Sequence, residues 1–179
     1  MDNYDYYEVQ EDTYWCDKLY HDVEFDRKIV LADKGDINAA YSVFKSYINK
    51  EYIKQDLNKA YRYLKKSADG GHKEAQFFAG MFHLLGYFHT GKNYDEAFKW
   101  IFKSANNNNK MGMYILYKFY ANGIGTPINI EESEKWKILY YDYKPADYNH
   151  FKNVTYSVYK RITETDSEKW FRYNQNLFS

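Results

Sequence analysis

The stretch KAYRYLKKSADGG, residues 59–71, decides the fold because the chain repeats it in phase. A related stretch, EAFKWIFKSANNN, follows at residues 96–108, and ESEKW at residues 132–136 begins a third copy. Ahead of these stretches, small residues and aromatic residues keep the same phase. The small residues are Ala39, Ala75 and Gly112, and the aromatic residues two places later are Tyr41, Phe77 and Tyr114. Self-similarity at a fixed period of this length predicts a stacked-repeat architecture.

Each repeat has the pattern of two helices. Apolar or small residues at i, i+4 and i+8 predict first helices over about 37–49, 73–85 and 110–122. Second helices are expected over about 56–69, 93–106 and 130–143. Helix-breaking glycines separate the two helices at Gly86–Gly91 and at Gly123–Pro127. Because one pair cannot bury its apolar stripe alone, the pairs must stack on one another.

A family pattern can be traced through the repeats. In the third repeat it runs through Gly112, Leu116, Tyr120, Gly123, Gly125, Ser133 and Trp136. This pattern resembles the Sel-1-like repeat family, a branch of the tetratricopeptide-type helical solenoids. The resemblance implies an all-α, right-handed α/α solenoid of stacked antiparallel helix pairs. Lys50 and Tyr52 stand where the family has glycines, so we expect the first inter-helix turn to close differently.

We expect a single solenoid domain over residues 1–179. Its repeats are assigned to residues 37–71, 72–108 and 109–143. Residues 1–36 are predicted to form degenerate, acidic leading helices. Residues 144–179, which contain a diverged copy of the repeat at Ser167–Trp170, are predicted to form C-terminal capping helices. Terminal units of solenoids are atypical because one of their faces meets water.

Charge is divided unevenly along the chain. The 25 basic and 25 acidic residues cancel overall, yet residues 1–36 hold eleven acidic and four basic residues. This segment therefore carries −7, and the rest of the chain carries +7. Such a separation can steer a charged partner, or it is an acidic cap on a mildly basic surface.

Composition excludes several classes of protein. The chain has no overall basic excess of the kind that nucleic-acid binders show. A single cysteine cannot form an internal disulfide. The sequence also lacks an apolar run long enough to span a membrane, and its acidic start lacks the apolar region of a secretory signal. We therefore expect a soluble, cytoplasmic protein.

The first helices hold the candidate partner-binding residues, because the resemblance implies that they line the concave face. Subtracting the packing positions leaves Ser46 and eight candidates: Ser42, Lys45, Phe78, Met81, Phe82, Ile115, Lys118 and Phe119. Their gradation from polar to aromatic suits an inserted helix or extended segment of a partner protein. The alternative is that a tightly wound solenoid buries the apolar members internally.

The residues that could carry catalysis or bind a metal lack the necessary spacing. His83 and His89 are six residues apart, whereas a helical metal-binding pair needs a spacing of four. His83 also occupies a tyrosine position of the repeat, which predicts a packed, hydrogen-bonded core histidine. Cys16 and His21 fall on different helical faces without a third catalytic residue. We expect no enzyme activity, no metal and no cofactor.

These observations favour a non-enzymatic module that binds another protein through its concave face. The resemblance implies that the family's members are mostly adaptors and scaffolds. One concrete hypothesis is an immunity protein that neutralises a cognate bacterial toxin or effector, with the −7 end covering a basic toxin. The alternative is a regulatory adaptor or chaperone-like protein with several cellular partners. Neither nucleic acid nor membrane is expected as a partner, and the oligomeric state stays open.

Overall fold

A computed structural model gives the fold of the protein and describes residues 22–49, 56–87 and 91–143. These residues form seven helices and no strand. A leading helix covers residues 22–33. The first helices of the three pairs are α2 (Ile37–Asn49), α4 (Lys73–Leu85) and α6 (Lys110–Asn122). The second helices are α3 (Leu57–Asp69), α5 (Tyr94–Asn106) and α7 (Ile130–Asp142). The predicted ranges of these six helices are confirmed to within one residue.

A polar side chain caps the start of each helix from α2 to α7. The cap accepts a hydrogen bond from the backbone N–H three residues later, which satisfies one of the donors that the first turn leaves unpaired. The capping residues are Asp36, His72 and Asn109 for the first helices and Asp56, Asn93 and Asn129 for the second helices. These short polar residues therefore define where each element begins.

Glycines end two of the first helices. Gly86 follows α4 with a φ of 75°, and Gly123 follows α6 with a φ of 70°. This left-handed conformation favours glycine because it crowds the Cβ atom of other residues. The N–H groups of Gly86 and Gly123 donate to the carbonyls of Phe82 and Phe119, so the last turn of each helix is closed.

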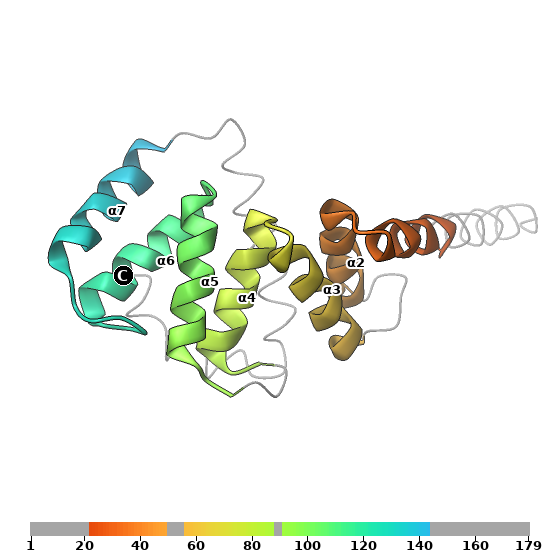
Figure 1. Ribbon diagram of the computed structural model, residues 1–179, viewed down its shortest axis with the longest axis horizontal. Coiled ribbons are helices and arrows are strands. Elements are labelled where there is room, and N and C mark those ends of the chain that lie inside the picture. The colour runs from red at the N-terminus through yellow and green to blue at the C-terminus, as the bar shows by residue number, and fades with distance from the viewer. Residues whose placement is uncertain (1–21, 50–55, 88–90, 144–179) are drawn as a thin grey trace, which may run out of the picture.

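The six helices pack in chain order. Each helix contacts its neighbours in the sequence, so the pairs α2–α3, α4–α5 and α6–α7 follow one another in a row. Figure 1 shows this row, with α7 at one end and the leading helix at the other. The described residues thus form the all-α solenoid of helix pairs that the sequence predicts.

One continuous core runs through the row. Its largest fully buried apolar side chains come from all three pairs: Phe44, Ile48, Leu64, Ile101, Leu116 and Phe119. Two glycines allow close approach between helices. A Cβ atom on Gly80 would lie 2.7 Å from Ile101 Cγ1, and one on Gly112 would lie 2.9 Å from the Ala105 nitrogen. These positions keep α4 close to α5, and α5 close to α6.

Several predictions of the sequence analysis lie outside the described residues. Residues 1–21 and 144–179 include most of the acidic leading segment and the predicted capping helices. The first inter-helix turn, with Lys50 and Tyr52, also lies outside them.

Candidate interaction surface

The structure divides the eight candidate residues into two groups. Five are core residues with exposed fractions of 6% or less: Phe78, Met81, Phe82, Ile115 and Phe119. Neighbouring first helices cover them, since the Phe44 ring of α2 lies 5.7 Å from that of Phe78 and 6.2 Å from that of Phe82. Their assignment as partner-binding residues is therefore corrected, because the solenoid buries these apolar side chains internally, which is the alternative that the sequence also allows. Adjacent repeats use them to pack against each other.

The three polar candidates stay at the surface. Ser42, Lys45 and Lys118 are half-buried on α2 and α6. The Lys45 ammonium lies 5.1 Å from the centre of the Tyr41 ring, one turn earlier on α2. The Lys118 ammonium lies 5.8 Å from the Tyr114 ring, which is the equivalent pair on α6. Two first helices therefore present the same tyrosine–lysine pair, and a cation over an aromatic face is an attractive contact.

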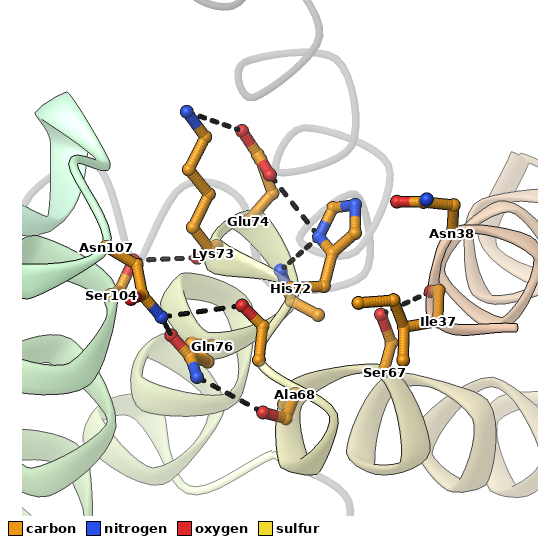
Figure 2. Close-up of polar contacts among 12 residues, drawn as sticks. Ile37, Asn38, Ser67, Ala68, His72, Lys73, Glu74, Gln76, Ser104 and Asn107 are labelled. Carbon is orange, nitrogen blue, oxygen red and sulfur yellow. Dashed lines mark hydrogen bonds and ion pairs between the residues drawn. The ribbon is translucent and has the colours of Figure 1, made fainter. Parts of the chain in front are cut away.

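Buried hydrogen bonds hold the first helices in register (Figure 2). Within two successive repeats, a serine of the second helix donates to the first carbonyl of the first helix: Ser67 to Ile37 and Ser104 to Lys73, both at 2.7 Å. Between repeats, the side chain of Gln76 donates to the Ala68 carbonyl at 3.2 Å. These bonds satisfy buried polar groups, so they fix the relative positions of the helices.

His72 lies at the junction between α3 and α4. Its Nδ1 accepts a hydrogen bond from the Ala75 N–H at 3.3 Å, and its ring stacks on Tyr41 at 4.3 Å. Glu74 Oε2 is also 3.3 Å from Nδ1 (Figure 2). Burial lowers the pKa of His72, and the charges of Lys45 and Lys73 act in the same direction while Glu74 opposes them. The neutral imidazole is the form that can cap α4, because only an unprotonated Nδ1 accepts a hydrogen bond.

Tyrosines gather where α6 meets α7. The Tyr114 ring lies 5.2 Å from Tyr117 and 5.3 Å from Tyr140, and Tyr141 lies 5.0 Å from Tyr140. Burial, with a smaller effect of Tyr114, raises the pKa of Tyr117 to about 12. The Tyr117 hydroxyl therefore stays protonated at neutral pH. Half-buried tyrosines combine apolar contact with a polar tip, a combination that is common at protein interfaces.

The exposed side of α7 carries large apolar side chains next to the ion pair of Glu134 with Lys137. Ile130, Ile138 and Tyr141 fall on one face of this helix with exposed fractions of 60%, 57% and 65%. Ser133 is the one buried residue of α7, and it donates to the Tyr117 carbonyl of α6 at 2.9 Å. The α6–α7 pair thus offers the largest concentration of accessible apolar and aromatic side chains among the described residues.

The residues considered for catalysis and metal binding form no site in the described ranges. Residues 22–49, 56–87 and 91–143 contain no cluster of histidine, cysteine or acidic side chains that could hold a metal ion. Cys16, His21 and His89 lie outside those ranges. His83 is half-buried, and its Nδ1 has no hydrogen-bond partner among the described residues, so the predicted hydrogen-bonded core role is not what they show. No helix in the same ranges is long and apolar enough to cross a membrane.

Sequence reasoning missed two features of this surface. His72 shares its phase with the caps Asp36 and Asn109, and that alignment could have identified its role. Tyr140 and Tyr141 stand where earlier repeats have small residues, Ser104 and Ala105 on α5. This departure from the repeat pattern was the available signal that α7 packs differently from α5.

The comparisons with known proteins agree with this architecture. The sequence matches the Sel1 repeat family over residues 38–72, 73–109 and 108–136, which is more than half of the chain. A search of curated proteins gave no match.

Two solved structures have a similar fold. A Sel1 repeat protein from Oxalobacter formigenes superimposes with a TM-score of 0.64 at 23% identity, over 74% of this chain and 97% of that one. A protective antigen present in uropathogenic Escherichia coli, which displays an SLR fold, gives a TM-score of 0.61 at 22% identity. That match covers 66% of this chain and 25% of the antigen. At such identities the likeness concerns the fold alone.

Proposed function

The chain belongs to the Sel1 repeat family, and on that premise we propose that it is a non-enzymatic module that binds a partner protein. The first-helix face and the adjoining α6–α7 end form the binding surface. The observation that carries the proposal is the tyrosine–lysine pairing on this face, Tyr41 with Lys45 and Tyr114 with Lys118. Family members generally serve as interaction scaffolds, and this surface supplies the side chains that interfaces use as anchors.

The rigidity of the scaffold supports this role. The helices that carry the surface are capped, Ser67 and Ser104 tie the first turns of α2 and α4 to the second helices, and Ser133 of α7 donates to Tyr117 of α6. Binding to a surface that is already ordered loses less conformational entropy than binding to one that must fold. The buried apolar candidates Phe78 and Phe119 contribute indirectly, because they hold the helices on which the exposed side chains stand.

Affinity capture with the full chain tests the proposal. We expect a stoichiometric protein partner, and we expect Tyr117→Ala with Ile138→Ser to reduce its recovery severalfold. Lys99→Gln is the matched control, because Lys99 pairs with Glu96 on the second helix α5. A chain that captures no partner, or one that loses its partner equally in the control, would contradict the proposal.

A finer version is that the protein is an immunity protein that neutralises a cognate bacterial toxin. The charge of −7 over residues 1–36 supports it, because such a segment attracts a basic toxin and speeds association. Co-purification with the product of the neighbouring reading frame tests this version. The on-rate should fall steeply with added salt, whereas an on-rate indifferent to salt removes the electrostatic part. Several weak cellular partners would instead favour a regulatory adaptor or chaperone-like protein.

A further inference from the structure

Lysines of the second helices are mostly paired with carboxylates. Six of the seven lysines on α3, α5 and α7 lie within 4.0 Å of an acidic oxygen: Lys59, Lys65, Lys66, Lys99, Lys135 and Lys137. The seventh, Lys103, lies over the Trp100 ring at 4.4 Å. The second-helix face therefore neutralises most of its own charge.

Two lysines of the first helices are arranged differently. Helices α2 and α6 contain no acidic residue, and Lys45 and Lys118 form no ion pair among the described residues. Both ammonium groups lie over tyrosine rings instead, and Lys118 reaches a second ring, that of Tyr117, at 5.6 Å. Glu74 is the one acidic residue on the described first helices, and it contacts His72 and Lys73.

The two lysines occupy equivalent positions two repeats apart. Met81 holds this position on α4, between them, and it is buried. At this position the first helices thus carry a lysine at each end of the row and a buried apolar side chain between them. A tyrosine ring offers an ammonium group no charge-assisted hydrogen bond, so each lysine keeps the capacity to pair with an arriving carboxylate.

The surroundings of Lys45 strengthen this capacity. Partial burial, followed by the charge of Lys28 on the leading helix, lowers the pKa of Lys45, while Glu74 acts weakly in the opposite direction. A half-buried ammonium beside a like charge gains more from a carboxylate than a fully solvated one does. A free surface lysine would gain little from the same contact.

We propose that the first-helix face binds an acidic segment of a partner protein, with one carboxylate at Lys45 and a second at Lys118. This inference rests on the proposed function and names the chemistry of the partner. Packed helices lie about 10 Å apart, so two repeats separate the lysines by about 20 Å. An extended chain rises about 3.3 Å per residue, so the two carboxylates should be about six residues apart.

Fluorescence anisotropy with the full chain tests the proposal. The probe is a labelled Gly/Ser peptide carrying two Glu-Asp pairs six residues apart, with a Gln-Asn version as its control. We expect saturable binding of the acidic peptide, weakened about threefold to tenfold by Lys45→Gln and by Lys118→Gln. Lys103→Gln, which removes a lysine held by an aromatic ring on the opposite set of helices, should leave binding unchanged.

Three results would overturn the inference. These are the absence of saturable binding, an equal loss in Lys103→Gln, and equally tight binding of single-stranded DNA through the same two lysines. The natural partner separates this inference from the proposed function. If wild type and the Lys45→Gln/Lys118→Gln double variant capture a partner equally well, the acidic-segment inference fails while the binding function stands.

Discussion

Helices α5 and α7 occupy equivalent places in their repeats, but α5 packs against helices on two sides and α7 against one helix among the described residues. Both have 13 residues, both start at an asparagine cap, and both place a tryptophan at the same position. Helix α5 buries five residues: Ala97, Trp100, Ile101, Ser104 and Ala105. Helix α7 buries Ser133 alone. The difference shows that the same local signals build the same helix, whereas the neighbours of that helix decide what becomes core.

The residues of the two helices have diverged accordingly. Helix α5 lies between α4 and α6, and α7 contacts α6 at the end of the described row. Ile101, Ser104 and Ala105 of α5 correspond in the repeat to Lys137, Tyr140 and Tyr141 of α7. Small and aliphatic residues suit close packing on both sides, while lysine and tyrosine keep polar tips in water. The end of the described row therefore keeps most of its side chains exposed or half-buried.

The largest difference in stability between α5 and α7 is expected from substitutions at one equivalent position. Ile101→Ala should lower the free energy of unfolding by about 2–5 kcal/mol, because Ile101 is fully buried and its loss leaves a cavity. Lys137→Ala should change it by at most about 0.5 kcal/mol, because the ion pair of Lys137 with Glu134 is exposed to solvent. Urea denaturation followed by circular dichroism measures both. Equal losses would show that α7 is packed as tightly as α5.

The helix caps provide a second, smaller contrast. Asn93→Ala and Asn129→Ala each remove a cap worth about 1 kcal/mol, since Asn93 and Asn129 accept from the N–H groups of Glu96 and Glu132. Loss of the α7 cap should accelerate amide hydrogen exchange within α7 only, because α7 is packed on fewer sides. Loss of the α5 cap should lower the protection of all the helices.

One control variant and one contradicting result test this prediction about the caps of α5 and α7. Asn129→Asp keeps a capping oxygen and should restore slow exchange in α7. Accelerated exchange throughout the chain in Asn129→Ala would mean that α7 opens together with the other helices.

A third, still smaller contrast concerns pH, because the cap of α4 titrates while that of α7 does not. The pKa of His72 is held below its ordinary value of 6.5, chiefly by burial, so the unfolded chain binds protons that the folded chain does not. Stability should therefore be full above about pH 6.5 and fall as the pH drops toward the folded pKa of His72. His83, whose pKa burial also lowers, adds to the same slope.

The variant His72→Asn isolates the share of His72. Asparagine caps α6 at the equivalent position, Asn109, so the variant should keep its stability at pH 7. Its loss of stability between pH 7 and pH 5 should be smaller than that of the wild type, as measured by thermal unfolding. An unchanged slope would assign the effect to His83 and to other groups.

Much of the fold can be predicted from the spacing of apolar residues and from the glycines that end helices. The apolar pattern predicted all six helices of the pairs because a helix repeats its buried face every few residues. The helix caps lie outside that apolar pattern, and histidine is an uncommon cap, so only the phase that His72 shares with Asp36 and Asn109 marks its role. The polar candidates Lys45 and Lys118 were found because no packing pattern includes them.

The sequence by itself determined the repeat, the helix boundaries and the stacking of helix pairs, because each of these depends on local spacing and on residues next to one another in the chain. Only the tertiary structure decided that Phe78, Phe82 and Phe119 belong to the core. Their burial depends on how closely the adjacent repeats approach, and the spacing of residues within one repeat does not contain that distance. It also decided that Ile130, Ile138 and Tyr141 of α7 are exposed, because α7 has no further packed neighbour among the described residues.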